Sequence, residues 1–77
     1  MMSSRAVKPA RKELGSRLRT MRKRAGFSQE GLGHRVGLSG KFIGEVERAE
    51  KSISVDSLIR VMRPLRKPAS TMLRGLR

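Results

Sequence analysis

The chain contains no cysteine, tryptophan or tyrosine, and its only aromatic residues are two phenylalanines among 77 residues. The absence of cysteine excludes disulfides and thiolate metal sites, and a single histidine excludes a histidine cluster for metal binding or catalysis. No apolar run approaches the length of about 18 residues that a membrane-spanning helix needs, and residues 1–12 lack the apolar stretch of a secretory signal. We therefore expect no metal, no cofactor and no membrane association, and these features are compatible with a reducing cytoplasm.

Acidic residues are also scarce, because six Asp and Glu stand against 19 Lys and Arg and leave a net charge of +13. A charge of this size indicates a polyanionic partner, since self-repulsion is otherwise costly. All acids except Glu13 lie between Glu30 and Asp56, so the positive excess lies in the flanking segments. Basic flanks would supply affinity for phosphates, and the nearly neutral centre would supply sequence discrimination. The alternative is that the flanks only keep the chain in solution.

The run from Ser28 to Glu47 predicts two short helices joined by a tight turn. Ser28 and Ser39 are helix-capping residues, and Gly37 suits the left-handed backbone that ends a first helix. Gly33 lets a second helix cross the first closely. The apolar residues recur at helical spacing and are Leu32, Val36, Phe42, Ile43 and Val46. This order predicts a helix-turn-helix in which Ser39 to Lys41, Gly44 and Glu45 face outward. The alternative is an ordinary hairpin of two helices.

The flanking sequence predicts three further helices and no strand. The first covers about 11–25, and its apolar stripe consists of Leu14, Leu18, Met21 and Ala25. Another follows the cap Ser54 and ends at Pro64. Its apolar face consists of Val55, Leu58, Ile59 and Met62.

A short last helix over about 69–76 follows Pro68, and its apolar edge consists of Met72, Leu73 and Leu76. So small an edge either contacts a second copy of the chain or packs on the first and fourth helices. We divide the chain into a disordered basic arm over 1–10, one helical domain over 11–66, and a short C-terminal helix or tail over 67–77. A core of this size is marginal alone, so pairing with a second copy would help.

Residues 13–65 resemble the Cro/cI-type helix-turn-helix family, also called the XRE family, whose members include phage repressors and bacterial regulators. The residues that carry the resemblance are Arg22-Lys23, Gly26, Phe27, Ser28-Gln29, Gly33, Gly37-Leu38-Ser39, Ile43 and Val46-Glu47-Arg48. The resemblance implies an all-α, compact λ-repressor-like DNA-binding domain of four to five helices. The segment SISVDSLIRVM is similar to the small, dimeric controller proteins of restriction–modification systems.

The resemblance also implies roles for particular residues. Those matching the positions that face the DNA major groove, and hence the bases, are Ser39, Gly40, Lys41, Phe42, Gly44 and Glu45. Those expected to contact phosphates are Ser28, Gln29, Arg48, Lys51 and Ser52. A partly buried salt bridge between Arg22 and Glu47 would hold the first helix to the recognition helix.

Side-chain chemistry indicates how these residues could read bases. Gly40 offers no side chain, so Lys41 would donate to guanine instead. Phe42 would touch a thymine methyl with whatever part of its ring lies outside the core. Glu45 could accept a hydrogen bond from cytosine N4, or it could instead position Lys41 or Lys51.

We therefore expect a transcriptional regulator, such as a repressor, that binds specific double-stranded DNA as a homodimer in a bacterial cytoplasm, encoded by the bacterium or a phage. A second hypothesis is an antitoxin that binds a toxin partner and regulates its own operon. A third is binding to any nucleic acid through the basic flanks. An enzyme is not expected, because no nucleophile has a base beside it and no acid–base pair or phosphate-binding loop is present.

Overall fold

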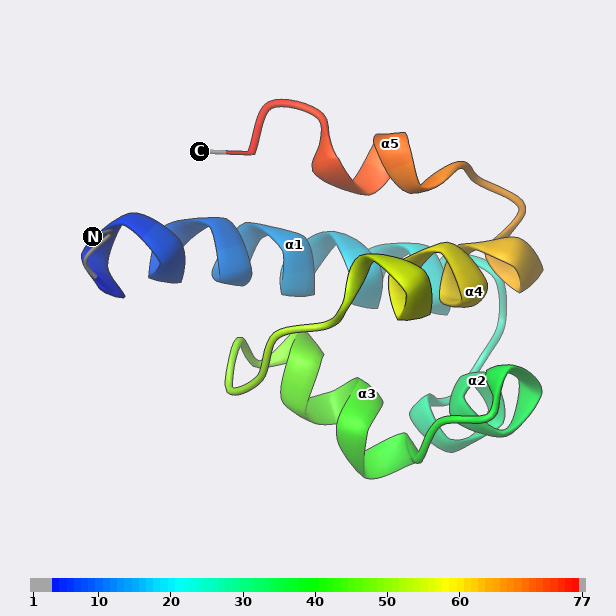
Figure 1. Cartoon of the computed structure of the whole chain (residues 1–77). Helices are drawn as coiled ribbons and strands as arrows, with labels where there is room; N and C mark the ends of the chain where they lie inside the picture. The colour runs from blue at the N-terminus through cyan, green and yellow to red at the C-terminus, as the bar shows by residue number, and fades with distance from the viewer. Residues whose placement is uncertain (1–3, 77) are drawn as a thin grey trace.

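The computed structural model describes residues 4–76 of the chain, with side chains described from residue 9 onward. It contains five helices in this order: α1 (Ser4–Arg24), α2 (Gln29–Val36), α3 (Gly40–Glu47), α4 (Val55–Leu65) and α5 (Ala69–Leu73). Figure 1 shows α1 as a long central helix, with α2 and α3 on one side of it and α5 on the other. The predicted all-α fold is confirmed. No described helix has the combination of length and apolar character needed to cross a bilayer.

The start of α1 differs from the prediction. The helix begins at Ser4 rather than near Arg11, so the prediction of a disordered arm is wrong for residues 4–10, while residues 1–3 lie outside the described part of the chain. Ala and basic residues in this stretch favour helix, and extending a formed helix costs less than nucleating one. Pro9 removes one helical N–H donor close to the N-terminus, where the loss is tolerated more easily.

The predicted caps of α2 and α3 are present. Ser28 Oγ accepts a hydrogen bond from the Gly31 N–H at 2.9 Å, and Ser39 Oγ accepts one from the Phe42 N–H at 3.0 Å. Gly37 ends α2 at a φ of 76°, which a residue without a Cβ adopts without strain. The turn between the two helices is therefore fixed by local chemistry at both of its ends.

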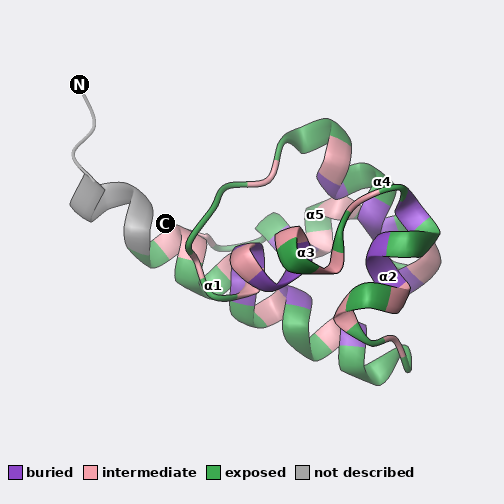
Figure 2. Ribbon diagram, turned by 90° about the horizontal axis from the view of Figure 1, so that it is seen from below, coloured by how far each residue is buried: buried purple, intermediate pink, exposed green. Residues whose placement is uncertain are grey.

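The hydrophobic core lies where the helices face one another, as the burial colouring in Figure 2 shows. Its fully buried side chains are Leu18, Leu32, Ile43, Val46, Val61, Met62 and Met72. Ala25 lies just beyond α1 and is exposed, so it does not extend the predicted stripe. Met72 is also enclosed, which places the middle of α5 on the core rather than on a free apolar edge.

The buried face of α4 differs from the prediction. Val55 and Ile59 are 64% and 44% exposed, whereas Val61 is fully buried and was not expected to be. The buried residues Leu58, Val61, Met62 and Leu65 follow the spacing i, i+3, i+4, i+7, which is also a helical stripe. Pro64 does not end the helix, which continues to Leu65. The missing N–H of Pro64 costs one helical hydrogen bond, to the Arg60 carbonyl, and burial of Leu65 in the core favours the last turn.

Two glycines allow helices to approach more closely than a Cβ would permit. A Cβ on Gly33 would lie 2.5 Å from the Leu38 carbonyl oxygen, so the predicted close crossing in the helix-turn-helix is present. A Cβ on Gly15, in α1, would lie 2.5 Å from the Glu47 carbonyl oxygen at the end of α3. The sequence pattern had not indicated this second contact, which sets the distance between α1 and α3.

Gly15→Ala tests the contact between α1 and α3. Although Ala is the better helix former, we expect overpacking to lower the free energy of unfolding by about 1–3 kcal/mol in urea denaturation. Ser16→Ala, at the exposed neighbouring position, is the control and should change stability by less than about 0.5 kcal/mol. Equal stability of the two variants would contradict the close approach.

Candidate nucleic-acid interface

A buried ion pair holds α3 against α1. The Arg22 Nε donates to Glu47 Oε2 at 2.6 Å, and its Nη2 donates to Glu47 Oε1 at 3.1 Å. Only 8% of the Arg22 side chain and 2% of the Glu47 side chain are exposed. The salt bridge expected from the resemblance is therefore present, in the bidentate geometry that makes guanidinium–carboxylate pairs strong.

Two further hydrogen bonds give the remaining polar atoms of this ion pair a partner. The Arg22 Nη1 donates to the Phe27 carbonyl at 2.8 Å, and the Gln29 Nε2 donates to Glu47 Oε1 at 3.1 Å. The pair thus joins α1, the α1–α2 connection, the start of α2 and the end of α3. Since buried charges are costly unless hydrogen-bonded, this set of partners fixes the position of α3.

The N-terminal end of α3 carries the free polar side chains of the predicted reading surface. Ser39 and Lys41 are exposed, and Phe42 is partly buried against the core. Lys41 forms no ion pair with any described residue, so its ammonium is available to a ligand. The core contact that the sequence allowed for Phe42 is therefore present, and part of the residue remains exposed.

Gly40 and Gly44 do not face outward as predicted. A Cβ on Gly40 would lie 2.8 Å from the Cα of Glu30, and Gly44 is buried. Both glycines instead lie where α3 packs against α2 and the residues around it. At Gly40 the backbone of Glu30 leaves no room for a side chain, whereas at Gly44 the nearest atoms are the ends of the flexible Gln29 and Arg48 side chains. Their predicted contact with bases therefore has no side-chain basis.

Glu45 lies beside Lys51 rather than free in solvent. Its Oε2 is 3.8 Å from the Lys51 Nζ, and only 15% of the Glu45 side chain is exposed. This geometry favours the alternative in which Glu45 positions Lys51 over the one in which it reads cytosine. Lys51 itself remains exposed, so its ammonium can still meet a phosphate.

The residues expected to contact phosphates lie at the start of α2 and after the end of α3. A Cβ on Gly44 would lie 2.9 Å from the Arg48 Nη1 and 3.1 Å from the Gln29 Oε1, so these two side chains approach the same point. Ser28 and Ser52 are exposed, although the Ser28 hydroxyl also caps α2. The fold therefore brings the start of α2 close to the loop after α3.

Arg48 also pairs with Glu50, through Arg48 Nε and Glu50 Oε2 at 2.8 Å. The hydrogen bond raises the pKa of Arg48 and lowers the pKa of Glu50, and the attraction of opposite charges adds to both shifts. Both side chains are more than half exposed, so the pair is open to solvent and to salt. A phosphate can therefore replace Glu50 as the partner of Arg48.

Two arginines outside the predicted site hold the framework together. Arg60 Nη1 donates to the Val36 carbonyl at 3.1 Å and so binds the C-terminus of α2 to α4. Arg17 Nη1 donates to the carbonyls of Met72 and Arg74, at 3.0 and 2.6 Å. Because their acceptors are backbone carbonyls far away in sequence, no residue pattern could have identified these contacts.

Two capped helices joined by a fixed turn, with the second held so that its N-terminal side chains are exposed, define a helix-turn-helix DNA-binding domain. The chain belongs to the helix-turn-helix domain family, because the model of that family matches residues 13–74. Membership agrees with the predicted Cro/cI-type resemblance, which is confirmed. The chain is a DNA-binding regulator of this class and not an enzyme.

Two solved structures are similar to this one. The restriction-modification controller protein C.AhdI from Aeromonas hydrophila has 29% identity and a TM-score of 0.77, over 80% of this chain and 90% of that chain. The c2 repressor of P22, solved in complex with a synthetic operator, has 31% identity and a TM-score of 0.74, over 80% of this chain and 94% of that chain. No curated protein matches the chain by sequence.

Glu47→Gln tests the buried ion pair, because the amide keeps the shape and leaves the Arg22 charge without a counter-charge. We expect the free energy of unfolding to fall by about 3–5 kcal/mol in urea denaturation. The double variant Arg22→Met/Glu47→Leu should recover part of this loss, since it removes both charges. Glu50→Gln breaks the exposed Arg48–Glu50 pair and should change stability little. A loss for Glu47→Gln no larger than for Glu50→Gln would contradict the role of the pair.

Proposed function

We propose that the chain is a transcriptional regulator that binds a specific double-stranded DNA sequence as a homodimer, with the N-terminal half of α3 in the major groove. The observation that carries the proposal is the fixed position of α3, whose end is anchored by Glu47 while Ser39 and Lys41 remain exposed. Similarity to a repressor solved with its operator and to a controller protein supports it. The relevant compartment is the bacterial cytoplasm, where such DNA is found.

Phosphate contacts would set the register of α3 in the groove. The residues that would make these contacts lie at the start of α2 and after the end of α3, where Gln29 and Arg48 approach each other, and are Ser28, Gln29, Arg48, Lys51 and Ser52. These contacts hold the domain without reading sequence, and the net charge of +13 strengthens them at low salt.

Few side chains are left to read bases. Lys41 would donate to guanine O6 or N7, and the accessible edge of Phe42 would touch a thymine methyl. Ser39 can donate to or accept from a base or a phosphate, whereas Gly40 and Gly44 offer only backbone. Discrimination would therefore rest mainly on Lys41, with Phe42 as an apolar contact.

Dimer formation would place two copies of α3 in successive major grooves, on half-sites one helical turn apart or a multiple of it. The exposed apolar residues of α4, Val55 and Ile59, are the best candidates for the contact because they lie four residues apart on one face. Asp56 and Arg63 lie on either side of Ile59 along the helix and are both exposed. Two antiparallel copies of α4 meeting at Ile59 would set Asp56 opposite Arg63 of the partner copy.

The experiment that tests the function is titration of labelled DNA from the upstream region of the gene, with a scrambled duplex as control, at several salt concentrations. We expect a complex with the upstream DNA that persists at salt concentrations at which the scrambled complex is lost. Footprinting should then show two half-sites. Equal and steeply salt-dependent binding to both duplexes would instead support binding through basic flanks alone.

Lys41→Ala tests the reading surface. Losing a specific base contact should weaken binding to the preferred site by about tenfold or more, while binding to scrambled DNA changes much less. Lys67→Ala is the matched control, because Lys67 is also exposed but lies in the α4–α5 connection, away from α3. Unchanged affinity of Lys41→Ala for the preferred site would contradict the assignment of α3.

Ile59→Ser tests the dimer surface. Replacing an apolar contact should weaken dimer formation about tenfold, as measured by sedimentation, and should reduce cooperative binding to DNA with two half-sites. Leu73→Ser in α5 is the comparison, because Leu73 is 45% exposed and belongs to the C-terminal segment, for which the sequence leaves both a dimer contact and packing on the domain open. Weakening by Leu73→Ser alone would place the contact on α5.

A further inference from the structure

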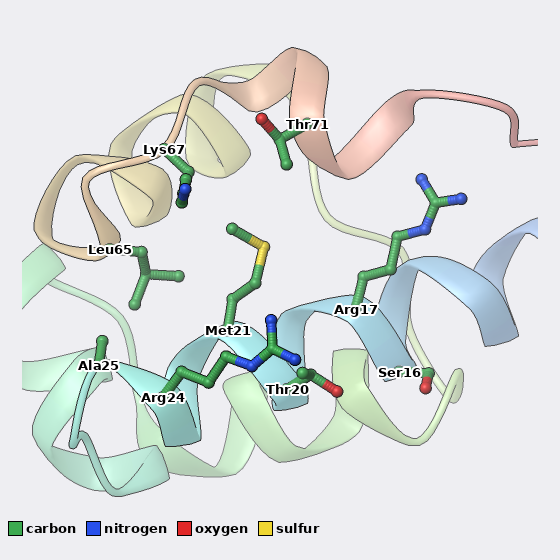
Figure 3. Close-up of a pocket in the computed structure, with 9 residues that line it drawn as sticks. All are labelled: Ser16, Arg17, Thr20, Met21, Arg24, Ala25, Leu65, Lys67 and Thr71. Atoms are coloured by element: carbon green, nitrogen blue, oxygen red, sulfur yellow. The ribbon is translucent and has the colours of Figure 1, made fainter.

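A groove of about 500 Å³ lies between α1, the end of α4 and α5. Figure 3 shows Met21 rising into its centre from α1, with Leu65 and Thr71 on the opposite walls. Met21 is partly buried and packs against the core, so its base is fixed while its flexible thioether end faces the open space. The floor of the groove is therefore apolar and adaptable.

The groove lies on the side of α1 that faces away from the DNA-reading helix. Gly15 and Arg22 point from α1 toward α3, because a Cβ on Gly15 would touch Glu47 and Arg22 pairs with it. At 3.6 residues per turn, Arg17 and Arg24 lie about half a turn away from Gly15 and Arg22. Figure 1 agrees, since α5 and α3 lie on opposite sides of α1. DNA bound at α3 would leave the groove open.

The rim of the groove is cationic. Arg17, Arg24 and Lys67 line it, and no acidic residue does. Among the described residues, neither Arg24 nor Lys67 forms an ion pair, and both are exposed. Arg17 is held in place by the carbonyls of Met72 and Arg74, and its Nη2 also pairs with Glu13 Oε1 at 2.6 Å. The groove thus joins an apolar floor to fixed and free positive charges.

We propose that this groove is a docking site for an acidic amphipathic helix of a partner protein. Apolar side chains of the partner would cover Met21 and Ala25, and its carboxylates would pair with Arg24 and Lys67. Helices that bind in grooves use apolar anchors at i, i+3, i+4 and i+7, which suits a groove running along α1. The inference is independent of DNA reading by α3.

The chemistry of the groove favours this occupant over two others. A DNA backbone would use the cations but would leave the apolar floor uncovered, so it gains nothing from Met21 and Ala25. A second copy of the chain has only six acidic residues against 19 basic ones, so it offers few carboxylates to pair with Arg24 and Lys67. A partner segment that is both apolar and acidic matches the apolar floor and the cationic rim of the groove.

The test uses a synthetic Leu/Glu peptide of about 15 residues, long enough to form a helix, with leucines on one face. The full chain carries ¹³C-labelled methionine methyl groups, and NMR follows each signal during titration. We expect a saturable shift of the Met21 methyl, while the enclosed Met62 and Met72 methyls move little. A peptide of the same composition with dispersed leucines, and a Leu/Lys peptide, should produce no saturable shift.

Charge reversal at the rim separates docking from non-specific attraction. Arg24→Glu/Lys67→Glu should weaken binding of the Leu/Glu peptide at least about tenfold, because both attractions become repulsions. Lys12→Glu/Arg19→Glu changes the charge equally at exposed positions of α1 outside the groove, and should weaken binding less than about threefold. Circular dichroism confirms that both variants are folded.

Three results would overturn the proposal. The first is no saturable Met21 shift with the Leu/Glu peptide, or the same shift with all three peptides. The second is equal weakening in the two double variants. The third is displacement of the peptide by duplex DNA with a shift of the Met21 methyl, which would make the groove a DNA contact. Because the readout is the Met21 methyl, failure here would leave the role of α3 in DNA binding intact.

Discussion

The buried pair of Arg22 and Glu47 is the interaction on which the arrangement of the domain depends. Two charges enclosed to this degree are tolerated only where every donor and acceptor has a partner. Here the partners come from α1, the α1–α2 connection, α2 and α3, so satisfying the pair requires all four segments to be in place. The position of α3, and with it the side chains offered to DNA, follows from this one electrostatic requirement.

Glycine supplies the second constraint. Gly15, Gly33 and Gly40 each lie where the backbone of another segment leaves no room for a Cβ, whereas Gly44 lies beneath the ends of the flexible Gln29 and Arg48 side chains. Each of the four lowers the intrinsic preference for helix by up to about 1 kcal/mol relative to alanine. The domain therefore depends on tertiary packing, rather than helix propensity, to keep α2 and α3 formed. One consequence is that few side chains of α3 can contact bases, since Gly40 packs against α2 and Gly44 is buried.

The charge distribution separates three surfaces around this frame. The surface around α3 carries Lys41 and the ion pairs Arg48–Glu50 and Glu45–Lys51. Acidic and basic charges therefore nearly balance there. The exposed face of α4 joins apolar side chains to both signs of charge, as a self-complementary contact requires. The groove behind α1 is basic with an apolar floor. The surfaces proposed for DNA, for a second copy and for a further partner therefore use different residues of the chain.

The sequence by itself determined the helices capped by Ser28, Ser39 and Ser54, the turn at Gly37 and the close crossing at Gly33, because caps, turns and small residues act on their immediate neighbours. The pairing of Arg22 with Glu47 came from family resemblance rather than from spacing. Only the tertiary structure decided that Gly40 and Gly44 face inward, that Val55 and Ile59 are exposed, and that Arg17 and Arg60 bind distant carbonyls. Periodicity identifies the stripe along a helix, but which neighbouring face covers that stripe is settled only when all the helices pack together.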